Sequence, residues 1–186
     1  VPILEKYSNK KAGKDFGLIS NPEFLQESNA IKDTKFPHAV VLGGYNTKYM
    51  KKARMFFSKL HPNTPIIITN HQTAEMVKYA NNSFLATKIS FINQLSNICQ
   101  NIPEANVDDI AKTIGLDPRI GKLFLNAGPG YGGSCLPKDM KALINFASSV
   151  GVKPILLNAV EEINQKQIQQ IIKLIEKKLK GISSKK

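Results

Sequence analysis

Cysteine is scarce in this sequence of 186 residues, and long hydrophobic runs are absent from it. Only Cys99 and Cys135 occur, with no second cluster of ligands between them, which argues against a disulfide framework and a zinc site. We therefore expect two free thiols and no metal. Because no stretch reaches about 18 apolar residues, no membrane span is expected either.

An initiator methionine and the charged-then-apolar pattern of a secretory leader are also missing from the start of the chain. The opening residues, Val1-Pro2-Ile3, are typical of an internal segment of a longer chain. This favours a cytoplasmic origin. The apolar content of 42% is that of a globular protein.

Acidic residues are few, since 14 Asp and Glu accompany 26 Lys and Arg and leave a formal net charge of +12. Such a charge suits an anionic partner, including nucleic acid. However, the excess is mostly lysine spread along the chain, densest between Lys173 and Lys186, and no recognition motif accompanies it. We interpret the charge as a solvated surface. A basic nucleic-acid-binding protein is the less favoured alternative.

Short apolar runs and a helical pattern alternate in the first third of the chain. The runs from Phe16 to Ile19, Ala39 to Leu42 and Pro65 to Thr69 are predicted strands. Residues 48–60, between the last two runs, have helical spacing. This pattern indicates a βαβ unit of a parallel sheet. Three strands would make a meagre parallel sheet, so we expect further strands before the first residue.

Helical spacing dominates the rest of the chain. The predicted helices run from Thr73 to about Ile102, from Val107 to Ile114 before a capping glycine, from about Pro137 to Val150, and from Ile155 to Leu179. Apolar residues of the first helix exceed one narrow stripe, as expected for a helix packed on two sides or across a dimer interface.

The segment from Gly128 to Gly133 satisfies the dinucleotide-binding pattern G-x-G-x-x-G. That motif requires a strand before it, a helix directly after it and an acidic residue about 20 positions on. Residues 120–127 are predicted as helix or loop, and the acids Asp139 and Glu161 lie at other distances. We therefore reject the motif, and no G-x-x-x-x-G-K-[ST] phosphate loop occurs either.

Cys135 follows this glycine-rich loop and begins the next predicted helix, with Lys138 close by. Amide groups at a helix N-terminus and a nearby cation both favour the thiolate, which is the nucleophilic form. Neighbouring glycines leave room for a substrate to approach the sulfur. A buried structural cysteine is the alternative. For Cys99, on an apolar helix face, that alternative is favoured.

Three separated strings resemble the UDP-glucose and GDP-mannose dehydrogenase family, in the family's order. They are Asn21-Pro22-Glu23-Phe24-Leu25-Gln26-Glu27-Ser28, the helical stretch from Glu75 to Ala86, and Gly130-Tyr131-Gly132-Gly133-Ser134-Cys135-Leu136-Pro137-Lys138-Asp139. The similarity runs from about residue 16 to residue 164. It implies NAD as cofactor, a nucleotide sugar as substrate and a homodimer through the central helical domain, with no nucleic acid and no membrane as partners.

The resemblance implies catalytic roles for five residues. Cys135 would attack a C6 aldehyde to give a thiohemiacetal, whose oxidation yields a thioester that water cleaves. Lys78 and Asn82 lie four residues apart, hence on one face of a helix. Lys78 would stabilise the oxyanion or assist proton removal, and Asn82 would help to position the water or oxygen. Asp139 would order water near the thiolate, and Glu23 would activate water to hydrolyse the thioester.

The resemblance also implies binding residues. Those at the substrate are Glu23, Phe24, Leu25, Gln26, Glu27, Lys78, Asn82, Arg119, Phe124, Tyr131 and Gly132, and those at the cofactor are Glu27, Cys135 and Lys138. Arg119 would reach the sugar site of the partner subunit. Glu23 and Glu27 are predicted one turn apart in a first helical turn capped by Asn21. Asn126 departs from the family, because some relatives have lysine there.

The implied fold class is an α/β remnant, a βαβ part of a Rossmann-type sheet, followed by a mainly α-helical dimerisation domain. Residues 1–70 would be the C-terminal part of the NAD-binding domain, residues 71–182 the central helical domain with a long connecting helix, and residues 183–186 a tail. The implied function is oxidation of UDP-glucose to UDP-glucuronate, with the chain alone inactive. A GDP-mannose or UDP-N-acetyl-sugar 6-dehydrogenase and a catalytically silent dimerisation module remain alternatives.

Overall fold

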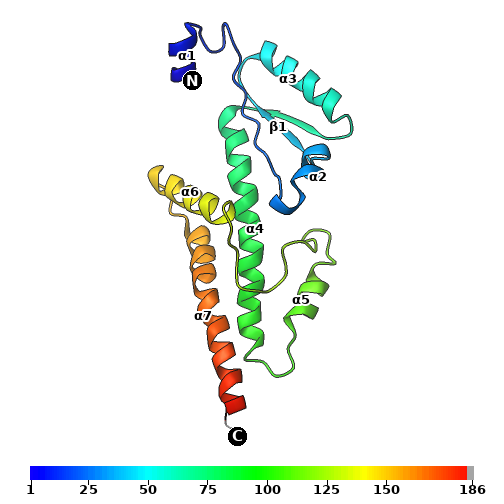
Figure 1. Ribbon diagram of the computed structural model, residues 1–186, viewed down its shortest axis with the longest axis vertical. Coiled ribbons are helices and arrows are strands. Elements are labelled where there is room, and N and C mark those ends of the chain that lie inside the picture. The colour runs from blue at the N-terminus through cyan, green and yellow to red at the C-terminus, as the bar shows by residue number, and fades with distance from the viewer. Residues whose placement is uncertain (184–186) are drawn as a thin grey trace. The chain divides into compact units, whose positions relative to one another are not determined.

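The computed structural model describes residues 1–183, which form helices and one two-stranded parallel sheet (Figure 1). The chain divides into two compact units, the first from Val1 to Ala80 and the second from Asn81 onward. Helix α4 begins in the first unit and ends in the second. The two units are described separately.

The first unit contains the sheet. Its elements are α1 (Pro2–Ser8), the 3-10 helix η1 (Glu27–Asn29), α2 (Ala30–Lys35), β1 (Val40–Gly43), α3 (Thr47–Leu60), β2 (Ile66–Thr69) and the start of α4 (His71–Cys99). Strands β1 and β2 pair in parallel through the α3 crossover, so the predicted βαβ unit is confirmed. Val40, Leu42 and Met50 form its buried core, because α3 packs on β1.

The predicted strand from Phe16 to Ile19 is wrong. Phe16 makes only a local bridge to Ala12, and the next residue to pair is Ser20, which exchanges two backbone hydrogen bonds of 2.9 and 2.8 Å with Gly43 in a single antiparallel bridge. Gly17 lies so close to α3 that an added Cβ would be 2.2 Å from the ring of Tyr49. Within this apolar run Ile19 packs against the core of Val40, Leu42 and Met50, whereas Leu18 is exposed, so the run belongs to no ladder.

The predicted first helical turn through Glu23 and Glu27 is also wrong. Residues 21–26 are irregular, and η1 begins only at Glu27. The side chain of Asn21, the predicted cap, donates instead to the carbonyl oxygen of Val41 at 2.9 Å. This bond ties the segment to β1.

The second unit is helical. Besides the rest of α4 it contains α5 (Val107–Ile114), α6 (Leu136–Ser149) and α7 (Ile155–Ser183). The four predicted helices are confirmed with shifts of a few residues at their ends. Gly115 ends α5 as predicted, with its N–H bonded to the carbonyl of Ala111, and Gly151 follows α6 at φ +78°.

The core of the second unit joins its helices to the glycine-rich loop. Ala86 of α4, Tyr131 of the loop, Met140 of α6 and Val160 of α7 pack together. The Ser90 hydroxyl of α4 donates to the carbonyl of Val160 at 3.0 Å, and α7 runs beside α4 in Figure 1. Tyr131 therefore anchors the loop that precedes Cys135 in the core.

The functional assignment of residues 1–70 and 71–182 to two domains stays a prediction. Of the predicted tail, Ser183 is the last residue of α7, and residues 184–186 lie outside the described residues. None of the helices within residues 1–183 has the length and apolarity needed to cross a membrane. Over the same residues, no group of three or more His, Cys, Asp or Glu side chains could hold a metal ion.

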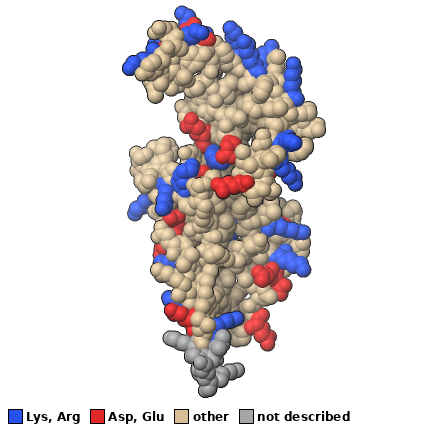
Figure 2. Space-filling model, viewed as in Figure 1, with Lys and Arg blue, Asp and Glu red and all other residues tan. Residues whose placement is uncertain are grey.

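The charged side chains agree with a solvated surface on the face in view. Figure 2 shows Lys and Arg dispersed over that face, with Asp and Glu among them. Helix α3 is the exception in composition, because it has five basic residues and no acidic one.

Candidate active site

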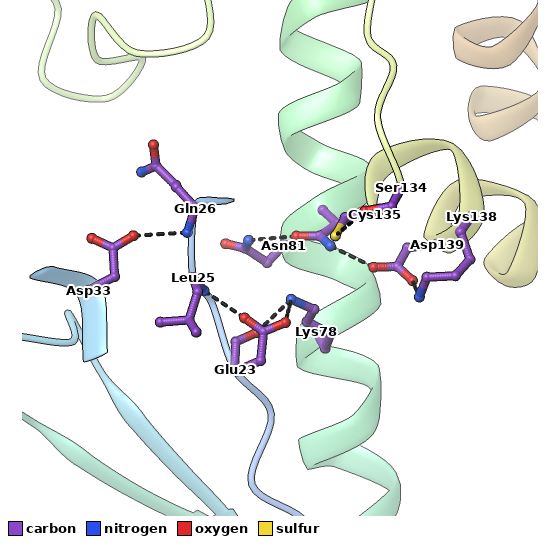
Figure 3. Close-up of polar contacts among 11 residues, drawn as sticks. Glu23, Leu25, Gln26, Asp33, Lys78, Asn81, Ser134, Cys135, Lys138 and Asp139 are labelled. Carbon is purple, nitrogen blue, oxygen red and sulfur yellow. Dashed lines mark hydrogen bonds and ion pairs between the residues drawn. The ribbon is translucent and has the colours of Figure 1, made fainter. Parts of the chain in front are cut away.

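Lys78 of the first unit is held by the segment that carries Glu23 (Figure 3). Its Nζ donates to the backbone oxygen of Glu23 at 2.6 Å and to Glu23 Oε1 at 2.8 Å. The Lys78 side chain is 20% exposed and that of Glu23 is 56% exposed, and Nζ lies 5.8 Å from the centre of the Phe24 ring. A cation and a carboxylate that were predicted to act in catalysis are therefore in direct contact.

The segment after Glu23 lines a cavity of about 440 Å³ within the first unit. Glu23 Oε2 accepts a hydrogen bond from the Leu25 N–H at 2.6 Å, and the Gln26 N–H donates to Asp33 at 2.9 Å. The Phe24 ring lies 5.1 Å from that of His38. These bonds fix the shape of a segment that has no regular secondary structure.

Cys135 of the second unit is the N-cap residue of α6, and its side chain is exposed. Its sulfur lies 3.5 Å from the hydroxyl oxygen of Ser134, and its carbonyl accepts the N–H of Asp139 at 2.9 Å, which closes the first turn of α6. Cys99, in contrast, is buried near the end of α4. The two thiols therefore differ sharply in access to solvent.

Asp139 is a buried carboxylate one turn into α6. It is 2% exposed, and its Oδ2 accepts a hydrogen bond of 2.6 Å from the amide of Asn82, itself 6% exposed. Lys138 donates to Oδ1 at 2.6 Å (Figure 3). A negative charge in the first turn also interacts favourably with the helix dipole. Asp139 thus fixes the orientation of the Asn82 amide, which α4 carries one turn after Lys78.

The glycine-rich loop follows an irregular segment, because residues 121–127 contain neither strand nor α-helix. The rejection of the dinucleotide motif is therefore confirmed. Tyr131 is buried in the core, and its hydroxyl donates to Glu161 at 2.7 Å. Burial and the nearby Glu161 carboxylate raise the pKa of Tyr131. Its predicted substrate contact stays a prediction, as does that of Gly132, which is exposed.

Changing Tyr131 to phenylalanine is expected to lower stability at pH 8 by about 1–2 kcal/mol, because a hydrogen bond to a carboxylate is lost. The raised pKa of Tyr131 means that the folded state holds this proton more tightly than the unfolded state. The contribution of the protonated Tyr131 hydroxyl to the free energy of unfolding is full below about pH 10, and it declines as the pH rises toward the pKa of Tyr131 in the folded state. Urea unfolding from pH 8 to 11 should show the two proteins converging, whereas a Tyr7→Phe control at an exposed ring should match the wild type throughout.

The loop after α5 carries two more predicted residues. The Arg119 guanidinium is largely exposed and pairs with Asp117 at 2.6 Å, which lowers the pKa of Asp117 and raises that of Arg119. Phe124 has φ +64°, a conformation that is uncommon for residues other than glycine. Lys88 of α4, which sequence reasoning missed, donates to the Ile120 and Gly121 carbonyls at 3.0 and 3.3 Å and ties this loop to the helix.

Sequence reasoning also missed the amide side chains that bind the glycine-rich loop. Asn93 of α4 and Asn164 and Gln167 of α7 hydrogen-bond to its backbone. The available signal was their spacing, since Asn93 follows the apolar Ala86 and Ile89 by seven and four residues and so shares their helix face. A polar residue on a buried face needs a buried partner.

The residues present fit only part of an NAD site. Over residues 1–183, neither strand is followed by a G-x-G-x-x-G turn that could cradle the pyrophosphate. Glu27, which begins η1, stays a predicted cofactor residue, together with Cys135 and Lys138 at the start of α6.

The sequence matches one family along most of its length. Residues 1–61 match the NAD binding domain of the UDP-glucose/GDP-mannose dehydrogenase family, and residues 72–166 match its central domain. Similar proteins include the putative UDP-glucose 6-dehydrogenase YtcA of Bacillus subtilis (45% identity over 92% of this chain and 40% of the relative) and the UDP-glucose 6-dehydrogenase of Rickettsia bellii (42%, over 92% and 41%). The chain thus spans about two fifths of the length of these relatives.

Solved structures agree with this match. A UDP-glucose dehydrogenase from Pyrobaculum islandicum is 35% identical, with a TM-score of 0.78 over 87% of this chain and 37% of that one. A GDP-mannose dehydrogenase from Pseudomonas aeruginosa is also 35% identical, with a TM-score of 0.58 over 95% of this chain and 40% of that one. The predicted fold class and the predicted cofactor, NAD, are confirmed. The chain belongs to the UDP-glucose/GDP-mannose dehydrogenase family of NAD-dependent oxidoreductases, of which it carries NAD-binding and central-domain sequence.

Proposed function

We propose that this chain supplies the nucleophile for oxidation of the C6 hydroxyl of UDP-glucose to the carboxylate of UDP-glucuronate. The observation that carries the proposal is the exposed thiol of Cys135 at the first turn of α6, with the buried Asp139 one turn on and bonded to Asn82. NAD, when bound, would accept the two hydrides that a four-electron oxidation releases.

In this scheme the sulfur of Cys135 adds to the C6 aldehyde that the first oxidation forms, giving a thiohemiacetal. The second oxidation converts it to a thioester, and water then breaks the carbon–sulfur bond to give the carboxylate and the free thiol. Asn82 suits the positioning of the substrate oxygen or water, because Asp139 holds its amide in one orientation. Asp139 itself would order water near the sulfur.

Lys78 would stabilise negative charge and Glu23 would accept a proton during the reaction at C6. An ammonium group 2.8 Å from a carboxylate can stabilise a developing oxyanion, and the carboxylate can accept a proton from water. We propose that Lys78 stabilises the oxyanion and that Glu23 activates the water that hydrolyses the thioester. Phe24, Leu25 and Gln26 would line the sugar, since they border the cavity in the first unit.

UDP-glucose is favoured over other nucleotide sugars because relatives that are 40–46% identical are named UDP-glucose 6-dehydrogenases. Oxidation of GDP-mannose is the second candidate, supported by the 35% identity to the Pseudomonas aeruginosa enzyme. We further propose that residues 1–70 belong to the NAD-binding part of the enzyme and residues 71–182 to its helical, catalytic part.

A homodimer is part of the proposal. Three large apolar side chains of α4, Phe84, Phe91 and Ile98, and Ile102 just after its end are 48 to 65% exposed. The first three recur every seven residues and so form one stripe along the helix, the pattern of a helix that packs against another. Arg119, largely exposed in one chain, would act at the sugar site of the partner. The cytoplasm remains the expected location.

The relative reactivity of the two thiols tests the proposal in the chain itself. At pH 7 iodoacetamide should alkylate Cys135 about 100-fold faster or more than Cys99, because only Cys135 is exposed. Peptide mass spectrometry over time would give both rates. In urea, where the chain is unfolded, the rates should converge. Equal, slow alkylation of both in the folded chain would instead support a silent dimerisation module.

A further inference from the structure

Gly128, the first residue of the glycine-rich loop, has both backbone groups bound by helix side chains. Its N–H donates to Asn93 Oδ1 of α4 at 2.7 Å, and its carbonyl accepts from Gln167 Nε2 of α7 at 2.9 Å. Gln167 is oriented in turn by Asn97, whose amide donates to its Oε1 at 3.1 Å. The loop therefore begins at a point fixed from two helices.

Tyr131, three residues later, also has both backbone groups hydrogen-bonded, in this case by a single side chain. Asn164 Oδ1 accepts the Tyr131 N–H at 2.8 Å, and Asn164 Nδ2 donates to the Tyr131 carbonyl at 3.0 Å. Between these points Gly130 has φ +102°, and an added Cβ would lie 2.4 Å from Asn164 Oδ1. The close approach of Asn164 to the loop thus depends on glycine at position 130.

Asn93 is fully buried and Gln167 is 4% exposed, so these two amides have no role on the surface, whereas Asn164 is part-buried. A buried amide is costly unless it is hydrogen-bonded, and here the bonds go to a loop that is otherwise irregular. Only Gly132, Gly133 and Ser134 separate the fixed Tyr131 from Cys135. The backbone path of those residues determines where α6 begins and where the Cys135 sulfur lies.

We propose that Asn93, Asn164 and Gln167 are positioning residues for Cys135, which they hold at the start of α6 through the loop from Gly128 to Tyr131. The inference rests on the proposed function of Cys135 as nucleophile. The three amides hydrogen-bond to the backbone of the loop and act through that backbone. Without them, the loop and the first turn of α6 sample other conformations, and the sulfur loses its fixed place at the N-terminal end of α6, where the helix dipole favours negative charge.

The test is Gln167→Met in the whole chain, which keeps the length of the side chain and removes its donor to Gly128. Gln169→Met, at an exposed position of the same helix, is the matched control. Amide hydrogen exchange of residues 128–134 should become about tenfold faster in Gln167→Met alone. Alkylation of Cys135 by iodoacetamide at pH 7 should slow about threefold or more, with the rate of Cys99 unchanged.

If amide hydrogen exchange of the loop in Gln167→Met equals that of the wild type, the three amides do not fix the loop, whatever Cys135 does in catalysis. Faster hydrogen exchange of the loop with an unchanged alkylation rate of Cys135 would show that the amides fix the loop but do not position Cys135. If Gln167→Met lowers the urea midpoint of the whole chain, Asn164→Asp is the second variant, because it keeps an acceptor for the Tyr131 N–H and replaces the donor to the Tyr131 carbonyl with a carboxylate oxygen that repels it. Hydrogen exchange of residues 128–134 and the alkylation rate of Cys135 in that variant then test the proposal in the same way.

Discussion

Replacing Asp139 with alanine is expected to lower the free energy of unfolding by about 3 kcal/mol. The carboxylate is 2% exposed and accepts the Asn82 amide at 2.6 Å. Alanine removes the acceptor and leaves the buried amide donor of Asn82 without a partner, and a cavity adds to the cost. Urea unfolding followed by circular dichroism at pH 7 would measure the loss.

One variant, Asp139→Asn, separates the hydrogen bond from the charge at this position, and a second, on another helix, is the control. Asp139→Asn keeps an oxygen that can accept from Asn82 and loses the ion pair with Lys138, whose side chain is 68% exposed, together with the negative charge in the first turn of α6. Its loss of stability should stay within about 1 kcal/mol, since exposed ion pairs contribute little. Asp109→Ala, at an exposed position of α5, should stay within about 0.5 kcal/mol. A loss below about 1 kcal/mol for Asp139→Ala would show that the buried pair does not stabilise the second unit.

The helices were predictable because their apolar residues repeat with the helical period, and Gly115 and Gly151 end two of them. The segment around Glu23 was not, because its shape depends on partners distant in sequence. Asn21 is a good N-cap by composition, yet its amide bonds a β1 carbonyl twenty residues on. Propensity describes neighbours along the chain, and here a tertiary bond outweighs it.

The candidate site shows the same division. Cys135 at the start of a helix was visible from the glycines and Pro137 around it. The bond from Asn82 to Asp139 joins residues 57 positions apart, and only the packing of α4 against α6 brings them into contact. The amides that bind the glycine-rich loop were invisible for a related reason. A polar residue in a long helix is assumed to face water until a buried partner is known.

Changing Cys135 to serine should abolish formation of UDP-glucuronate, with the largest effect that we expect for any substitution. The chain alone is expected to have negligible turnover, because it spans about two fifths of its relatives, and NADH formed from UDP-glucose by the chain alone would contradict this. The test therefore uses a hybrid in which this chain replaces the matching segment of the UDP-glucose 6-dehydrogenase TuaD of Bacillus subtilis, to which it is 46% identical.

In that hybrid, loss of the nucleophile should reduce the rate of UDP-glucuronate formation by on the order of 10³-fold or more. A serine hydroxyl cannot replace the thiolate, because it is a far weaker nucleophile at neutral pH and a poorer leaving group. Cys99→Ser in the same hybrid is the matched control and should keep its rate within about threefold, since Cys99 is buried near the end of α4.

The decisive measurement is the yield of UDP-glucuronate and NADH from UDP-glucose by the hybrid, its Cys135→Ser variant and its Cys99→Ser variant, with TuaD itself as reference. We predict two NADH per UDP-glucuronate for the hybrid and for Cys99→Ser, and no detectable UDP-glucuronate for Cys135→Ser. A Cys135→Ser hybrid that keeps more than about a tenth of the rate, or a folded hybrid that binds NAD and forms no UDP-glucuronate, would contradict the role proposed for this thiol.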